Sequence, residues 1–125
     1  MQNPYLNGRL RSFGHAFRGL KVLVQTQHNA RIHAVATVLV IAAGALLHIS
    51  LTKWALIALA IACVWAAEAL NTAIEFVVDL VSPEPHPLAA KAKDVAAAAV
   101  LLAAIGALVM GCLVFGPYAV PLLVQ

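Results

Sequence analysis

Three long apolar runs constrain the fold of this chain more than any other feature of its sequence. They cover residues 32–48, 54–81 and 95–115. An α-helix rises about 1.5 Å per residue, so about 20 residues cross the roughly 30 Å hydrocarbon core of a bilayer. Hydrophobic residues make up 63% of the 125 residues and charged residues only 10%, which excludes an ordinary soluble domain. The chain is therefore predicted to be an all-α membrane protein with three transmembrane helices.

Residues 9–27 precede these runs and have the pattern of a helix that lies on a membrane surface. Phe13, Phe17, Leu20 and Val24 recur at intervals of three or four residues, so they share one face of a helix. Basic side chains between them can contact lipid head groups, as in an interfacial amphipathic helix. The alternative is a basic tail that only directs topology. The helix is favoured because such a tail has no need of an apolar face.

The basic residues predict how the chain is oriented in the membrane. Five of the eight lysines and arginines precede the first apolar run, Lys53 alone follows it, and Lys91 and Lys93 precede the third. Segments rich in these residues stay in the cytoplasm, so the N-terminus and the proline-rich connection at residues 82–87 are predicted to be cytoplasmic. Residues 1–125 are interpreted as one domain. Because three helices leave polar faces towards lipid, a homo-oligomer is expected.

All five acidic residues lie in the second half of the chain, and three of them share a helix face with an asparagine. Glu68, Asn71, Glu75 and Asp79 follow one another at intervals of three or four residues. Residues 54–67 before them carry no charge. A carboxyl group beside such an apolar run is costly, so it usually has a function.

The depth of these side chains separates their chemical roles. Glu68 and Glu75 lie about 10 Å apart along one helix, too far to share a proton or a metal ion. Glu75 and Asp79, nearer the cytoplasm, suit Mg²⁺, which binds one or two carboxylates together with phosphate oxygens. Glu68 lies deeper and suits general-base chemistry on an alcohol at the membrane surface. Because Lys91 and Lys93 can neutralise a polyphosphate, the residues predict phosphoryl transfer from a nucleotide to a lipid hydroxyl.

The segment EALNTAIEFVVD (residues 68–79), followed by SPEPHPL (82–88) and AKD (92–94), resembles the signature of the prokaryotic diacylglycerol kinase and undecaprenol kinase family. The resemblance extends to residues 17–21 and 29–33 and so covers nearly the whole chain. It implies a homotrimeric enzyme of the bacterial inner membrane, with a surface helix and three transmembrane helices per subunit and active sites between subunits. It also implies ATP as phosphoryl donor, Mg²⁺ as cofactor, a lipid alcohol as acceptor and no nucleic-acid partner.

The resemblance also implies roles for individual residues. It makes Glu68 the catalytic base, with Asn71 beside it, and makes Glu75 a magnesium ligand. The family commonly has a second metal-binding glutamate where this chain has Gln27. An amide oxygen can bind Mg²⁺ but brings no negative charge, so weaker binding of a second ion is expected. The nucleotide site is implied to consist of His15, Glu75, Asp79, Glu84, Pro85, His86, Lys93 and Asp94.

Several alternatives stay open on the sequence alone. A proton-coupled transporter explains Glu68 but not the acidic residues on the cytoplasmic side. A catalytically silent homologue that binds nucleotide or lipid is indicated only by Gln27. Asp79 can serve a structural ion pair with Lys93 in place of a nucleotide site. His33, like His28, lacks the carboxylate neighbours of a metal site and is predicted not to bind a metal.

The acceptor lipid is predicted with a slight preference. The motifs at residues 82–88 and 29–33 are more similar to the undecaprenol kinase branch of the family than to the diacylglycerol kinase branch. Undecaprenol is therefore favoured over diacylglycerol as the substrate. A groove of aliphatic side chains discriminates poorly among lipid tails, so composition adds nothing to this choice.

Overall fold

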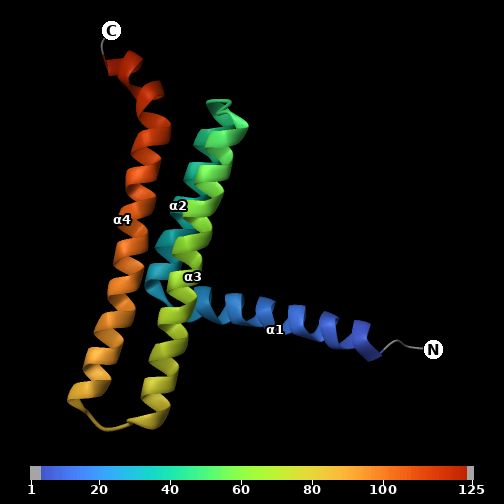
Figure 1. Cartoon of the computed structure of the whole chain (residues 1–125), viewed down its shortest axis with the longest axis vertical. Helices are drawn as coiled ribbons and strands as arrows, with labels where there is room; N and C mark the ends of the chain where they lie inside the picture. The colour runs from blue at the N-terminus through green and yellow to red at the C-terminus, as the bar shows by residue number, and fades with distance from the viewer. Residues whose placement is uncertain (1–3, 124–125) are drawn as a thin grey trace.

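The structure is a computed structural model that describes residues 4–123, with side-chain positions for residues 11–119. In Figure 1 the first helix leaves at a steep angle from the bundle of the other helices, which run along the long axis of the molecule. Within the described part of the chain every regular element is helical. In chain order the helices are α1 (Pro4–Thr26), α2 (His28–Leu46), α3 (Leu51–Val81) and α4 (Pro87–Leu123).

Three of these helices have the length and composition of membrane spans. They are α2, α3 and the Pro87–Ala119 portion of α4. Large aliphatic side chains on their surfaces, such as Leu102 at 70% exposure and Leu108 at 68%, have no partner within the subunit that would keep them from water. Exposed apolar surface of this extent requires lipid or other helices around it. The predicted all-α membrane fold with an N-terminal helix is confirmed.

Several predicted helix limits are wrong. The third membrane helix begins at Pro87 and not at residue 95, because a proline in the first turn loses no intrahelical hydrogen bond. The helix therefore includes Lys91 and Lys93, and it continues past Phe115. The second membrane helix begins at Leu51, since the Ser50 hydroxyl accepts a hydrogen bond from the Lys53 amide (3.5 Å) and caps the helix. The limits of the first two helices also differ from the prediction. The helix α1 covers Pro4–Thr26 in place of residues 9–27, and α2 covers His28–Leu46 in place of residues 32–48.

A buried apolar cluster lies at the end of the bundle where α2 turns into α3. It consists of Ile49, Ile57 and Val114, with Trp54 and Tyr118 against it. The Lys53 Nζ lies 4.4 Å from the centre of the Tyr118 ring and donates to its hydroxyl group (3.3 Å), which ties α3 to the C-terminal part of α4. The helices α3 and α4 contact each other more extensively than any other pair of helices, so they form the main packing interface of the subunit.

The sharp change of direction between α1 and α2 is held by Arg31. Its Nε donates to the Val24 carbonyl (3.0 Å), and its guanidinium also donates to the Gln25 carbonyl. These carbonyl groups belong to the last turn of α1, where no helical partner is available. Gln27 between the helices has an extended backbone (φ −101°, ψ 122°), which ends α1 and allows α2 to start in a new direction. The orientation of α1 in Figure 1 follows from this junction.

Candidate functional site

The middle of α3 buries three consecutive polar positions of its inward face. Glu68 is 1% exposed, Asn71 7% and Thr72 4%, and these are the buried polar side chains of the described region. The Thr72 hydroxyl donates to the backbone carbonyl of Glu68 (3.0 Å). Asn71 Nδ2 donates to Glu75 Oε1 (3.0 Å), so the amide side chain orients the next carboxylate along the helix. We call Glu68, Asn71 and Glu75 the α3 polar row.

Two oxygen atoms of the α3 polar row have no hydrogen-bond partner in the described structure. They are Oε2 of Glu68 and Oδ1 of Asn71, and both are buried. A buried acceptor without a donor costs about 1–3 kcal/mol, and more when it is charged. The other polar side chains within one turn of Glu68 do not donate to its carboxyl group; they are Trp65, Asn71 and Thr72, whose donors serve other atoms. A further donor is therefore required to satisfy these atoms.

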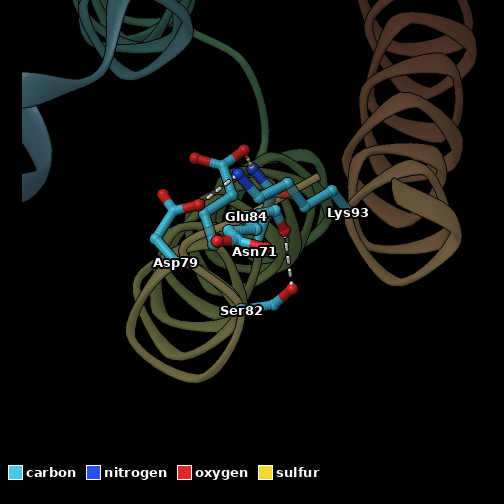
Figure 2. Close-up of polar contacts among 6 residues, drawn as sticks. Asn71, Asp79, Ser82, Glu84 and Lys93 are labelled. Carbon is cyan, nitrogen blue, oxygen red and sulfur yellow. Dashed lines mark hydrogen bonds and ion pairs between the residues drawn. The ribbon is translucent and has the colours of Figure 1, made fainter. Parts of the chain in front are cut away.

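A second group of candidate residues surrounds the connection between α3 and α4. A hollow of about 620 Å³ is lined there by residues of the end of α3, the connection itself and the first turns of α4. Lys93 Nζ on α4 forms an ion pair with Asp79 Oδ1 on α3 (2.5 Å), as Figure 2 shows. We call this space the loop hollow. The predicted nucleotide residues that line it are Asp79, Glu84, Pro85, His86 and Lys93.

The ion pair in the loop hollow is accessible to a ligand. The Lys93 side chain is 40% exposed and that of Asp79 is 63% exposed. An exposed pair of this kind contributes about 0–1 kcal/mol to stability, so its charges can be redirected to a ligand at little cost. The structural ion pair between Asp79 and Lys93 is therefore present, but it does not prevent Lys93 from binding a phosphate group.

Local hydrogen bonds give the connection a defined conformation. The Ser82 hydroxyl donates to the Glu84 carbonyl (2.9 Å). His86 Nδ1 accepts from the Leu88 amide (3.2 Å), so the imidazole caps the N-terminus of α4 just before Pro87. A capping imidazole at Nδ1 leaves Nε2 to face the surroundings. The hollow is consequently a formed feature of the subunit.

Three predicted site residues lie apart from both groups. His15 is exposed on α1, where its Nδ1 accepts from an Arg18 guanidinium N–H (2.7 Å). Gln27 is half-buried between α1 and α2, and its side chain makes no capping hydrogen bond. Asp94 is exposed on α4 beside Lys93 but does not line the loop hollow. The described subunit alone does not gather these three with the others.

A residue without an assigned role in the sequence analysis also belongs near the site. His33 on α2 is half-buried and is an electrostatic neighbour of the Glu68 carboxyl group on α3. It also lines an apolar hollow of about 630 Å³ that reaches from His33 along α2, α3 and α4. The proximity of His33 to Glu68 depends on how α2 is placed against α3, which residue spacing along the sequence does not report. The weak motif at residues 29–33 was the one signal that pointed to this position.

The donor set is suited to a magnesium ion only in part. Among the residues that the structure describes, no three His, Cys, Asp or Glu side chains come close enough to hold a metal together. Mg²⁺ nevertheless binds through one or two carboxylates and completes its shell with water and phosphate. Glu75 provides one half-buried carboxylate, of which Oε1 accepts from Asn71. The residues therefore fit an ion that arrives with a polyphosphate.

Comparison with known proteins gives a consistent result. Residues 14–115 match the family described as prokaryotic diacylglycerol kinase. The undecaprenol kinase of Bacillus subtilis is 42% identical over 112 residues, which cover 90% of this chain and 91% of that protein. The diacylglycerol kinase of Synechocystis is 48% identical over 108 residues, or 85% of this chain and 62% of that protein. The diacylglycerol kinase of Escherichia coli K12 is 32% identical over 83% of this chain and 85% of its own length. The chain thus belongs to the prokaryotic diacylglycerol kinase family and is a membrane lipid kinase.

Proposed function

We propose that this kinase transfers the γ-phosphoryl group of ATP to the hydroxyl group of a lipid alcohol, with Glu68 as general base. The observation that carries the proposal is the buried Glu68 carboxyl group, whose Oε2 has no donor in the described structure. A lipid hydroxyl supplies a donor of the required kind. Proton transfer to Glu68 then makes the hydroxyl oxygen a nucleophile for the phosphoryl group.

Asn71 has a positioning role in this proposal. Its Nδ2 donates to Glu75, and its Oδ1 is buried without a hydrogen-bond partner. An amide with one end fixed presents the other end in a defined direction. Asn71 can therefore orient the acceptor hydroxyl or a water molecule between the base and the nucleotide.

The nucleotide is proposed to bind on the cytoplasmic side of the α3 polar row. Lys93 supplies a positive charge for the phosphates, and the loop hollow beside it supplies space and polar groups. Glu75 is proposed to hold Mg²⁺, with Gln27 as a neutral ligand of a second ion. When bound, the ion would neutralise charge on the phosphates as the phosphoryl group is transferred.

A trimer with shared active sites is proposed as the working form. His15, Gln27 and Asp94 are separate from the loop hollow within the subunit, so a neighbouring copy is the natural source of the missing contacts. The exposed aliphatic surfaces of α2 and α4 give such copies a place to pack. The basic residues support an inner-membrane orientation with the N-terminus in the cytoplasm, on the side where ATP is found.

Undecaprenol is proposed as the preferred acceptor. Support comes from the motifs at residues 82–88 and 29–33 and from the Bacillus subtilis relative, which is named an undecaprenol kinase and matches over nearly its full length. The apolar hollow along α2, α3 and α4 offers space for part of a lipid tail. Diacylglycerol is the alternative acceptor, since two other relatives are named diacylglycerol kinases.

The proposal is tested with the purified protein in mixed micelles that contain γ-labelled ATP and Mg²⁺. Undecaprenol and diacylglycerol are offered separately, and labelled lipid is extracted and quantified. We expect labelled lipid with both and a higher kcat/KM with undecaprenol. Label in neither lipid, with nucleotide still bound in an equilibrium assay, would identify a silent homologue and refute the proposed reaction. Neither product nor nucleotide binding would instead favour the transporter interpretation.

A further inference from the structure

We propose that His33 is a positioning residue for Glu68: its imidazole N–H donates to the buried carboxyl group and holds it towards the acceptor hydroxyl. This inference rests on the proposed role of Glu68 as base. It adds an α2 residue to a site otherwise built on α3 and α4. It also gives the half-buried His33 a function within the membrane bundle.

The register between α2 and α3 places these two side chains at the same level. The Trp65 indole N–H on α3 donates to the Thr37 hydroxyl on α2 (3.1 Å), which fixes the two helices against each other. The connection at residues 47–50 is short, so α2 and α3 run in opposite directions. One turn back from Thr37 on α2 is His33, and one turn on from Trp65 on α3 is Glu68. The hydrogen bond therefore sets His33 opposite Glu68.

The neighbourhood of His33 agrees with this register. His33 and Thr37 line the same hollow as Val64, which lies one turn before Glu68 on α3. The Thr37 hydroxyl accepts from Trp65 and donates to the His33 carbonyl (2.7 Å). These two hydrogen bonds connect the backbone at His33 to α3 through Thr37. His33 from α2 and Glu75 from its own helix are titratable neighbours of the Glu68 carboxyl group.

The other polar side chains near Glu68 already donate elsewhere. Trp65 donates to Thr37, Asn71 donates to Glu75, and Thr72 donates to the Glu68 backbone carbonyl. Glu68 Oε2 is left without a donor. His33 is thus the side chain on the facing helix that can provide one. A fixed orientation matters because a misplacement of about 1 Å in a catalytic group can cost about 100-fold in rate.

The experiment uses the full chain in lipid micelles and the variants His33→Ala and His33→Gln. His33→Ala is expected to lower kcat about 10- to 100-fold while the KM for ATP stays unchanged. His33→Gln keeps an N–H donor. Its decrease in log kcat is therefore expected to be no more than half of the decrease seen in His33→Ala. His48→Asn is the matched control. His48 is exposed in the turn that follows α2 and has a φ of 49°, a conformation that asparagine tolerates, so normal turnover is expected.

A second readout is independent of turnover. In protein labelled with ¹⁵N-histidine, Glu68→Gln is expected to shift the ring nitrogen signals of His33 and to leave those of His48 in place. Unchanged His33 signals, or a normal kcat for His33→Ala, would overturn the inference. Equal losses in His33→Ala and His33→Gln, with both folded, would also overturn it. If Glu68→Gln keeps full turnover, Glu68 is not the base, and then the proposed function fails in its own right.

Discussion

At the level of single residues, the Glu68 carboxyl group is enclosed by its neighbours while one of its oxygens receives no hydrogen bond. Its neighbours on α3 are apolar except for Trp65, Asn71 and Thr72, whose donors serve other atoms. Removing a carboxyl group from water without a full set of partners opposes folding. Such a group is retained when the reaction needs it, which is the usual conflict between stability and activity in active sites.

This conflict predicts opposite effects of two core substitutions. Glu68→Met keeps the side-chain volume and removes the buried unpartnered oxygen, so it is expected to retain or raise the thermal unfolding midpoint while abolishing lipid phosphorylation. Ile57→Ala removes apolar contacts from a side chain that is 3% exposed, and is expected to lower the unfolding free energy by about 2–5 kcal/mol. Thermal unfolding in detergent measures both. A Glu68→Met protein as unstable as Ile57→Ala would contradict this account.

Gln27 offers a direct test of the proposed second metal position. Gln27→Glu adds a negative charge at the half-buried junction of α1 and α2 and is expected to lower the Mg²⁺ concentration for half-maximal rate several-fold. The matched control is Gln25→Glu, the same chemical change at an exposed position two residues earlier. Activity is titrated with Mg²⁺ at fixed total ATP. Equal shifts in both variants would show only a general surface-charge effect and remove Gln27 from the metal site.

The Asp79–Lys93 pair separates a structural role from a binding role. Lys93→Met is expected to change the unfolding free energy by no more than about 1 kcal/mol, because the pair is exposed. The same variant is expected to raise the KM for ATP at least tenfold, because a phosphate contact is lost. Lys91→Met is the comparison variant, since Lys91 is exposed on α4 and does not line the loop hollow. A similar KM in both variants would argue against Lys93 as the phosphate ligand.

At the level of elements, the turn between α2 and α3 depends on a glycine. A Cβ atom at Gly44 would lie 2.8 Å from Trp54 Cη2 and 3.1 Å from Ile49 Cδ1. Gly44→Ala is therefore expected to destabilise the bundle by about 1–3 kcal/mol through overpacking. Gly14→Ala on α1 meets nothing within 4 Å and is expected to be neutral or slightly stabilising. The thermal unfolding midpoints of Gly44→Ala and Gly14→Ala are measured. Equal midpoints in the two variants would show that α2 can shift away from Trp54 without loss of stability.

The sequence predicts the number of membrane helices but not where each helix begins and ends. Apolar runs of sufficient length predict the three membrane helices, because the bilayer thickness sets the length that is needed. The start of α4 at Pro87 was missed because the continuous apolar run begins only after Lys91, Lys93 and Asp94. Charged residues are compatible with a helix that extends into water beyond the bilayer. Composition therefore reports the part of a helix inside the membrane and not its full extent.

The candidate site was likewise predictable where it lies on one helix. The order of Glu68, Asn71 and Glu75 along α3 follows from the helical repeat, and the structure adds the hydrogen bond between the last two. The contribution of His33 was not predictable, since it depends on the Trp65–Thr37 bond that sets α2 against α3. The capping role of His86 was missed for a similar reason. It requires the backbone of the α3–α4 connection to be known.

At the level of the whole molecule, the subunit alone leaves much of its apolar surface and part of its site uncovered. His15 and Gln27 lie on or beside α1, which points away from the α2–α4 bundle in Figure 1. Association of copies can cover the aliphatic surfaces and bring α1 of one subunit towards the site of the next. We expect a protein mass of three chains of 13.1 kDa in detergent, measured by light scattering after subtraction of the micelle. A fully active monomer would contradict the shared-site proposal.

This membrane kinase is proposed to use the buried Glu68 carboxyl group to activate a lipid hydroxyl for phosphorylation. The most direct measurement is a single-turnover experiment, with enzyme in excess over γ-labelled ATP and with undecaprenol present. We expect label to appear in the lipid with the natural protein. With Glu68→Gln we expect bound ATP but no labelled lipid on the same time scale. Transfer by Glu68→Gln at the normal rate would contradict the account.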